Sequence, residues 1–224
     1  MDSAGWDERY AATARVWSAG PNCWVEELVA LMTPAPGRHA LDVGAGEGRN
    51  ALWLAERGWT VTAVDFSQVA LTRAHDLAVE RLAERAERVV LVRADLDDYV
   101  PEPGSYDLVL VAYLHLPAER RRQVLARAAD ALAPGGTLLV VGHDRTNLDD
   151  GVGGPQDPAV LYTAADLLTD LGGHGLEVVR AERVVRLVGT PDGDRDGLDA
   201  LLVAIRPLEA RAPTVRPALH KELS

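Results

Sequence analysis

Three alternating glycines follow a short apolar run near the first fifth of the chain. The segment 41–52 has the sequence Leu-Asp-Val-Gly-Ala-Gly-Glu-Gly-Arg-Asn-Ala-Leu. A strand that passes through a glycine turn into a helix presents unpaired backbone N–H groups and the positive end of the helix dipole. We therefore expect an anionic group of a ligand to bind at this turn.

An acidic residue follows the glycine turn at a sequence separation that is typical of nucleoside-binding folds. Asp65 ends a second apolar run, Thr60 to Val64, and lies 21 residues after Gly44. A β-α-β unit uses this interval to present an acid to the hydroxyls of a bound ribose. The two segments together predict a nucleoside site.

The glycine spacing separates two classes of nucleoside ligand. A dinucleotide turn places its third glycine at position 49, whereas this chain has Gly44, Gly46 and Gly48, with Arg49 next. An arginine there would crowd a pyrophosphate, but it suits a bidentate pair with a carboxylate. The pattern favours a charged amino-acid nucleoside.

Two histidines follow predicted strands where a doubly wound sheet binds its ligands. His115 comes after the run Leu108 to Val111, and His143, followed by Asp144, comes after the run Leu138 to Val141. Histidine suits general base catalysis at neutral pH. We expect His115 to be the first choice for a base or substrate contact, and His143 with Asp144 the second, with hydrogen-bonded loop residues as the alternative. The remaining histidines fall outside this edge: His39, His75, His174 and His220.

Short apolar runs separated by helix-length segments predict the elements that position these residues. The predicted strands are Ala40–Val43, Thr60–Val64, Val89–Val92, Leu108–Val111 and Leu138–Val141. This spacing is typical of a parallel sheet covered by helices on both faces, so the fold class is α/β and doubly wound. Apolar residues from Val124 to Leu132 fall on one helical face, which leaves Arg120, Arg121, Arg122 and Arg127 mostly toward solvent.

The second half of the chain carries weaker patterns. The glycine-rich stretch Asn147–Tyr162 is expected to form part of the acceptor pocket or its cover. Thr163 and Asp166 predict the start of a helix that runs through Leu171. Two strands, Glu177–Leu187 and Leu198–Ile205, are expected to flank a turn-rich stretch at 189–197 as a closing hairpin.

Composition excludes several classes of function. The 224 residues carry a net charge of −11, which disfavours nucleic acid, and their longest apolar runs are too short to cross a bilayer. Lys221 is the only lysine, which argues against Schiff-base and P-loop chemistry and removes the Tyr-x-x-x-Lys pair of short-chain dehydrogenases. The single cysteine, Cys23, and the absence of zinc-type spacing fit a cytoplasmic protein with no bound metal.

Taken together, the segment 41–67 resembles motif I and the acidic loop of class I S-adenosylmethionine-dependent methyltransferases. Within that family it is most similar to the small-molecule branch that includes the tellurite-resistance and thiopurine-type enzymes. The resemblance covers Trp6 to Arg206 and implies a seven-stranded, mostly parallel Rossmann-like sheet whose last strand is antiparallel. It implies one domain, 1–206, with an N-terminal helical lid at 1–36, and a proline-containing tail at 207–224.

The resemblance also assigns cofactor contacts position by position. Gly44, Ala45 and Gly46 would line the methionine part, and Asp42 would orient the turn or meet the amino group. Arg49 would meet the cofactor carboxylate, Asp65 the ribose, and Phe66 the adenine. The further assigned positions are Ser67, Ala94, Asp95 and Leu96 beside the adenine edge, Ala112 and Tyr113 beside the sulfonium, and Trp6, Tyr10 and Trp17 in the lid. Two purely structural alternatives stay open. In the first, Asp95 caps a turn toward Tyr99; in the second, the N-terminal aromatic residues form the apolar face of a helix packed on the sheet.

The implied reaction is in-line transfer of a methyl group from S-adenosylmethionine to a small molecule, which leaves S-adenosylhomocysteine. The accepting atom stays open among oxygen, nitrogen, sulfur, selenium and tellurium, and a soft acceptor needs no base. Tyr113-Leu114-His115-Leu116-Pro117 stands where enzymes acting on nucleic-acid base amines have Asn-Pro-Pro-Tyr. The alternatives are a non-catalytic S-adenosylmethionine-binding protein and an NAD(P)-dependent oxidoreductase, and the oligomeric state is open.

Overall fold

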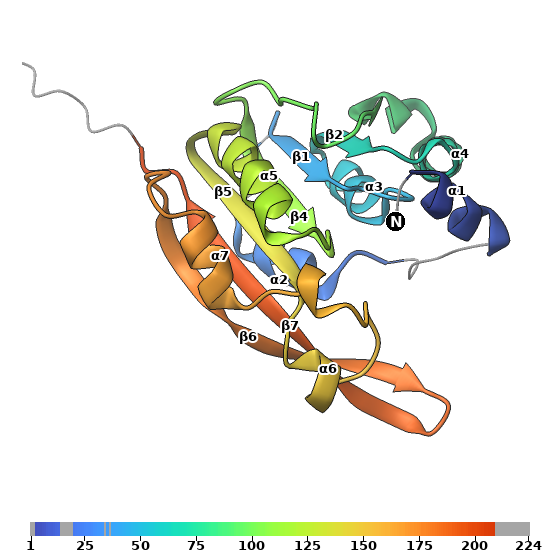
Figure 1. The fold of residues 1–224 in the computed structure, drawn as a ribbon. Helices are drawn as coiled ribbons and strands as arrows, with labels where there is room; N and C mark the ends of the chain where they lie inside the picture. The colour runs from blue at the N-terminus through green and yellow to red at the C-terminus, as the bar shows by residue number, and fades with distance from the viewer. Residues whose placement is uncertain (1–2, 14–19, 34, 36, 209–224) are drawn as a thin grey trace, which may run out of the picture.

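The computed structural model describes residues 3–13, 20–33, 35 and 37–208, and in this part the chain forms one seven-stranded sheet (Figure 1). The strand order is β3-β2-β1-β4-β5-β7-β6. The strands are β1 His39–Val43, β2 Thr60–Asp65, β3 Val89–Arg93, β4 Tyr106–Ala112, β5 Leu132–His143, β6 Glu177–Thr190 and β7 Gly193–Ile205. Strands β1 to β5 pair in parallel, and β7 is antiparallel to both β5 and β6. The predicted doubly wound α/β fold with an antiparallel last strand is confirmed.

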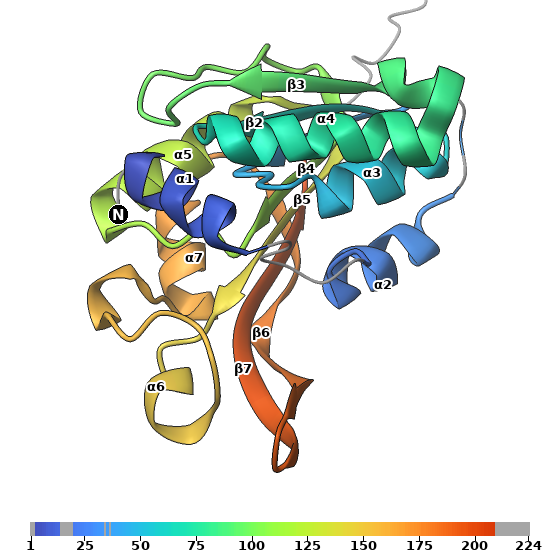
Figure 2. The ribbon, with the colours of Figure 1, turned by 90° about the vertical axis from the view of Figure 1, so that its right-hand side faces the viewer.

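The central strands are buried on both faces because helices cover the sheet from either side (Figures 1 and 2). One face packs against α2 Cys23–Leu31, α3 Arg49–Glu56 and α4 Gln68–Leu82, the last of which continues into the 3-10 turn η1 Ala83–Arg88. The other face packs against α5 Ala118–Asp130 and α7 Ala164–Asp170. This double cover explains why the strands are continuous apolar runs instead of alternating ones.

One arginine of α5 lies in the interior, contrary to the expected solvent position. Arg121 is 6% exposed, and its Nε donates to Asp170 at 2.6 Å. Its guanidinium carbon also lies 5.1 Å from the ring centroid of Tyr162. The apolar periodicity of α5 could not reveal this, because the partner carboxylate is supplied by α7, about 50 residues later in the chain. The capping box of Thr163 and Asp166 does begin α7 as predicted.

The closing hairpin is longer than its turn-rich sequence suggested. Most of the stretch 189–197 is strand, and β6 and β7 stay paired up to Thr190 and Gly193. His143, the last residue of β5, pairs with Asp199, so the part of β7 before Leu198 pairs with β6 alone. The hairpin therefore projects beyond the ligand-binding edge of the sheet, beside α6 Asn147–Asp150 and the short turn η2 Pro158–Val160 (Figure 1).

Two helices precede the sheet, in the segment predicted to be a helical lid. Helix α1, Ser3–Ala12, lies against the start of α4, and α2 lies beside α3 (Figure 2). The predicted lid residue Trp17 and most of the predicted tail, 209–224, fall outside the described residues. Among the described residues, no helix is long and apolar enough to cross a membrane, and no group of His, Cys, Asp and Glu side chains is arranged to hold a metal.

Candidate active site

The glycine turn connects β1 to α3 in a conformation that glycine adopts most readily. Gly44, Gly46 and Gly48 have φ values of 71°, 55° and 76°. A Cβ at Gly48 would lie 3.1 Å from the Cβ of Ala74 on α4, so the third glycine lets that helix approach closely. The turn thus combines an open backbone with tight packing behind it.

Asp65 at the end of β2 is fixed by the turn and by its own loop. Its two carboxylate oxygens accept from the backbone N–H groups of Gly46 at 2.8 Å and Ser67 at 2.9 Å. The residue is 6% exposed, and burial raises the pKa of its carboxyl against the opposing effect of these hydrogen bonds. Phe66 follows it half-buried. The predicted ribose acid and the glycine turn therefore form one rigid unit.

Asp42 supplies an unsatisfied acceptor behind the turn. Its carboxylate accepts from the backbone N–H of Ala51 at the start of α3, while its Oδ2 is buried without a hydrogen-bond partner. Burial raises the pKa of this carboxyl to about 7, although the nearby Arg49 guanidinium opposes the shift. A buried acceptor of this kind fits the ammonium of an amino acid, and Arg49 fits its carboxylate. These residues match the amino-acid end of S-adenosylmethionine.

Helix α1 is held against the same loops. The Asp7 carboxylate accepts from the Ser67 hydroxyl and, at 3.3 Å, from the backbone N–H of Val69. On this helix Tyr10 is 4% exposed, and its ring lies 5.6 Å from that of the half-buried Trp6. The contact places both predicted lid aromatics beside the start of α4.

Asp95 lies in the turn after β3 with its side chain 49% exposed. Its carboxylate accepts from the backbone N–H of Asp97 at 3.0 Å and pairs with Arg120 at 3.4 Å. Its neighbours Ala94 and Leu96 are half-buried. The turn-capping alternative is thus present in the structure, and the exposed carboxylate also leaves room for a second partner.

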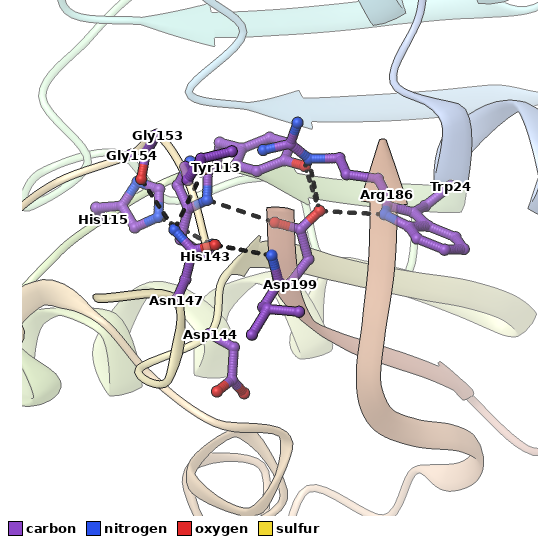
Figure 3. Close-up of polar contacts among 12 residues, drawn as sticks. Trp24, Tyr113, His115, His143, Asp144, Asn147, Gly153, Gly154, Arg186 and Asp199 are labelled. Carbon is purple, nitrogen blue, oxygen red and sulfur yellow. Dashed lines mark hydrogen bonds and ion pairs between the residues drawn. The ribbon is translucent and has the colours of Figure 1, made fainter. Parts of the chain in front are cut away.

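A second group of polar side chains lies where β4 and β5 end, beside α2 and the middle of β6 and β7 (Figure 3). We call it the acceptor cluster, and it consists of Trp24, Tyr113, His115, His143, Arg186 and Asp199. Its centre is the fully buried Asp199. Asp199 Oδ2 accepts from Tyr113 Oη at 2.6 Å, from Arg186 Nε at 2.8 Å and from Trp24 Nε1 at 3.3 Å.

His143 faces the other oxygen of Asp199. Its Nδ1 lies 3.5 Å from Asp199 Oδ1, and neither atom has a hydrogen-bond partner among the residues that the structure describes. A small closure of this distance gives an Nδ1–H that donates to the carboxylate, which leaves Nε2 as the proton acceptor. A Cβ on Gly154 would lie 2.7 Å from that Nε2, so only a glycine lets the 147–157 loop pack over the ring. Burial lowers the pKa of His143 to about 4, and Arg186 adds to the effect, so the imidazole is neutral at pH 7.

The imidazole of His115 already forms hydrogen bonds and a ring contact inside the protein. Its Nε2 accepts from the backbone N–H of His143 at 3.2 Å, and it forms a backbone hydrogen bond with Tyr113. Its ring stacks on that of His143 with centroids 5.2 Å apart, and burial lowers its pKa to about 4. The geometry favours a positioning role for His115 and favours His143 as the base, which reverses the order expected from the sequence.

Asp144 does not serve His143 as its carboxylate partner. Its Oδ1 accepts from the backbone N–H and hydroxyl of Thr146, and its side chain points away from the acceptor cluster (Figure 3). The residue that faces His143 comes from β7, more than 50 positions later. A signal for it exists in the sequence, since Asp199 is a lone acid inside the apolar run 198–205.

Tyr113 connects the acceptor cluster with the glycine turn. It follows β4 directly after the half-buried Ala112 and adopts a φ of 56°, in the left-handed region that side chains other than glycine rarely occupy. The guanidinium carbons of Arg49 and Arg186 lie 5.9 and 5.5 Å from its ring centroid. Burial and the Asp199 carboxylate raise the pKa of its hydroxyl, so Tyr113 stays protonated and donates. Such strained residues are typical of functional sites.

Comparison with known proteins agrees with the geometry of the glycine turn. A family model described as "Methyltransferase domain" matches residues 40–136. Glycine N-methyltransferase of Rattus norvegicus is 29% identical over 203 residues, which are 84% of this chain and 68% of the relative. The chain is an S-adenosylmethionine-dependent methyltransferase of class I. The matched domain contains the turn and Asp65 but ends before His143, so the cofactor half of this methyltransferase is its recognisable part.

Two solved structures show the same fold. A S-adenosylmethionine-dependent methyltransferase from Methanosarcina mazei superposes with a TM-score of 0.63 at 18% identity, covering 82% of this chain and 98% of that one. Magnesium protoporphyrin IX methyltransferase from Synechocystis PCC 6803, solved with bound S-adenosylmethionine, superposes with a TM-score of 0.60 at 22% identity, covering 91% and 80%. This methyltransferase spans about two thirds of two glycine N-methyltransferases and half or less of three other curated relatives.

Proposed function

We propose that this methyltransferase methylates an oxygen or nitrogen atom of a small molecule and that His143 accepts the proton which that atom loses. The observation that carries the proposal is the pair of unpartnered, buried atoms, His143 Nδ1 and Asp199 Oδ1, which face each other beyond the end of β5. A histidine held in this way is oriented and keeps its second nitrogen for a proton.

In this proposal, one group of residues binds the cofactor and a second group binds the acceptor and takes its proton. When bound, S-adenosylmethionine supplies a methyl group already activated for displacement, so the protein contributes alignment and the exclusion of water. Arg49 and Asp42 hold the amino-acid end, and Asp65 holds the ribose. Tyr113 lies between this end and the acceptor cluster, where His143 accepts the proton and Asp199 stabilises the imidazolium that forms.

The projecting β6–β7 hairpin and the 147–157 loop enclose the place for the acceptor. Asn147 joins the two, because its Oδ1 accepts from the N–H of Leu198 and its Nδ2 donates to the carbonyl of Gly153. The net charge of −11 disfavours nucleic acid as the acceptor. A small molecule and a cytoplasmic location are the assignments we propose.

The finer branch within the family is also a proposal. Relatives named as acting on glycine nitrogen and on 2-heptyl-1-hydroxyquinolin-4(1H)-one support a nitrogen or oxygen acceptor. The resemblance to the tellurite-resistance and thiopurine-type branch instead suggests a soft acceptor, which needs no base. The oriented His143 favours the first assignment.

The test measures production of S-adenosylhomocysteine with a panel of amine, hydroxyl, thiol and selenol acceptors. For an amine or hydroxyl acceptor, His143→Ala is expected to lower kcat by about 10² to 10⁴-fold at unchanged affinity for S-adenosylhomocysteine. His115→Ala serves as the matched comparison, and we expect a smaller loss from it. Turnover of thiols alone, with no effect of His143→Ala, would refute the proposed base and favour the soft-acceptor branch.

Calorimetry separates the two alternatives of function. Binding of S-adenosylhomocysteine without turnover on any acceptor would indicate the non-catalytic binding protein. Tight binding of NAD with no response to S-adenosylhomocysteine would indicate the oxidoreductase, which Arg49 and the family match both disfavour.

A further inference from the structure

A groove of about 650 Å³ lies at the edge of the sheet opposite the cofactor turn. Its lining includes Val29 of α2, Trp53 and Arg57 at the end of α3, and Arg38, Trp59 and Arg88, which directly precede β1, β2 and β3. These residues stand at the N-terminal ends of the strands, whereas the cofactor loops follow the C-terminal ends. We call this feature the basal groove.

Two of its three arginines are held in place by tryptophans. The guanidinium carbon of Arg57 lies 3.7 Å from the ring centroid of Trp53, and its Nη1 donates to the Trp53 carbonyl at 3.4 Å. The guanidinium carbon of Arg38 lies 5.4 Å from the ring centroid of Trp59. Stacking on an indole fixes the plane of a guanidinium and leaves its outer N–H groups available.

The lining of the basal groove is positively charged, although the chain as a whole is acidic. In the part of the chain that the structure describes, Arg38, Arg57 and Arg88 form no ion pair with a carboxylate, although acids outnumber bases 34 to 23 overall. Eight other arginines of that part do pair: Arg73, Arg81, Arg120, Arg121, Arg122, Arg145, Arg180 and Arg186. Glu26 is the one acid in the groove lining, so an anion of about two charges balances the groove.

The walls of the basal groove also offer apolar surface to a ligand. Trp53 and Trp59 are only 7% and 6% exposed, and the Arg57 and Arg38 guanidinium groups lie over their rings, so the apolar surface open to a ligand is the aliphatic wall of Val29 and Met32. The volume is within the range of about 300–1,000 Å³ that small-molecule sites occupy. Guanidinium groups bind phosphate through paired N–H donors, and an aliphatic wall binds an apolar body.

We propose that the basal groove binds an organic phosphate, with the phosphate on Arg38, Arg57 and Arg88 and its apolar body against Val29 and Met32. The site is separate from the cofactor turn and from the acceptor cluster. It does not depend on the proposed base or on the class of methyl acceptor.

Titration calorimetry on the full chain tests the proposal, with saturating S-adenosylhomocysteine present to block the cofactor site. The probe is 1-naphthyl phosphate, and inorganic phosphate and 1-naphthol represent its two halves. We expect one saturable site that binds the probe at least tenfold more tightly than either half. Arg57→Gln with Arg88→Gln is expected to weaken binding of the probe at least tenfold.

The control is Arg85→Gln, which removes an exposed positive charge three residues before Arg88 and outside the groove lining. It should change the affinity less than twofold. The variants should keep the melting temperature and the affinity for S-adenosylhomocysteine of the parent, and Arg88→Gln alone carries the test if the double variant does not fold. The proposal is overturned if the probe shows no saturable binding, if it binds no better than its halves, or if the groove variants bind it as the parent does.

Discussion

The cofactor half, Leu41–Ser67, and the acceptor cluster hold their carboxylates in different ways. In the cofactor half, Asp65 accepts from backbone N–H groups of Gly46 and Ser67, both within 20 residues of it. In the acceptor cluster, Asp199 accepts from side chains that come from α2, from the end of β4 and from β6. Backbone donors are fixed by the local fold, whereas side-chain donors require distant elements to meet.

This difference has consequences for stability and for specificity. A site built from one β-α-β unit keeps its geometry when the rest of the chain changes, so it suits a cofactor common to a family. A site assembled from five elements changes whenever one of them does, so it suits an acceptor that differs among relatives. The family match to residues 40–136 agrees with this division.

The largest effect on stability is expected when the central acid of the acceptor cluster is removed. Asp199→Ala is expected to lower the free energy of unfolding by about 3–5 kcal/mol, because the Tyr113 hydroxyl, the half-buried Arg186 guanidinium and the Trp24 indole N–H all lose their shared, fully buried acceptor. Urea denaturation measures the change. Arg186→Met combined with Asp199→Ala should restore part of the loss, since both charges are then gone. A loss below about 1 kcal/mol for Asp199→Ala would show that the network contributes little.

The corresponding change in the cofactor half acts on ligand binding. Asp65→Ala is expected to weaken binding of S-adenosylhomocysteine by about 1–3 kcal/mol, because it removes a buried acceptor and leaves two backbone N–H groups unpaired. Calorimetry at pH 7.5 measures the affinity. An unchanged affinity would contradict the role of Asp65 in holding the ribose.

The raised pKa of Asp42 predicts a pH dependence that belongs to the cofactor half alone. A carboxyl with a pKa of about 7 is half-protonated at that pH, and we expect its ionised form to bind the cofactor ammonium better. Affinity for S-adenosylhomocysteine should therefore fall about tenfold as the pH is lowered from 7.5 to 6. Asp42→Asn should bind more weakly at pH 7.5 and lose this dependence. A variant that keeps the full pH dependence would assign it to another group.

The smallest effect is expected at the rim of the cofactor half. Asp95→Ala should weaken binding of S-adenosylhomocysteine by less than about 1 kcal/mol, because the carboxylate is half exposed and is already engaged with Arg120 and Asp97. Comparison with Asp65→Ala in the same titration measures the difference. A loss as large as that of Asp65→Ala would show that Asp95 becomes buried against the adenine when the ligand binds.

Local sequence predicted the first part of the molecule well, for a physical reason. The central strands β1, β4 and β5 are buried on both faces over most of their length, so each contains a largely apolar run that a single sequence reveals. The capping box at Thr163 is equally local, because both partners lie within one helical turn. The length of the β6–β7 hairpin was not predicted, since its outer residues are polar and pair only with one another.

The surroundings of the candidate base, His143, could not be predicted from the sequence. Position after a strand identified both His115 and His143, but it could not tell which one has a free nitrogen. Asp144 was the expected partner of His143 because it is adjacent in sequence, whereas the structure places Asp199 there and turns Asp144 toward Thr146. The buried Arg121 escaped prediction in the same way, because its partner Asp170 belongs to another helix.

The sequence by itself determined the α/β class, the glycine turn and the acid at Asp65, because a β-α-β unit fixes their separation along the chain. Only the tertiary structure decided that His143 faces Asp199, that Arg186 neutralises this acid, and that three arginines and two tryptophans line one groove at the opposite end of the strands. The acceptor cluster joins residues up to 175 positions apart, as in the Trp24–Asp199 hydrogen bond, and such distances depend on how β7 and the helices pack, which no local pattern records.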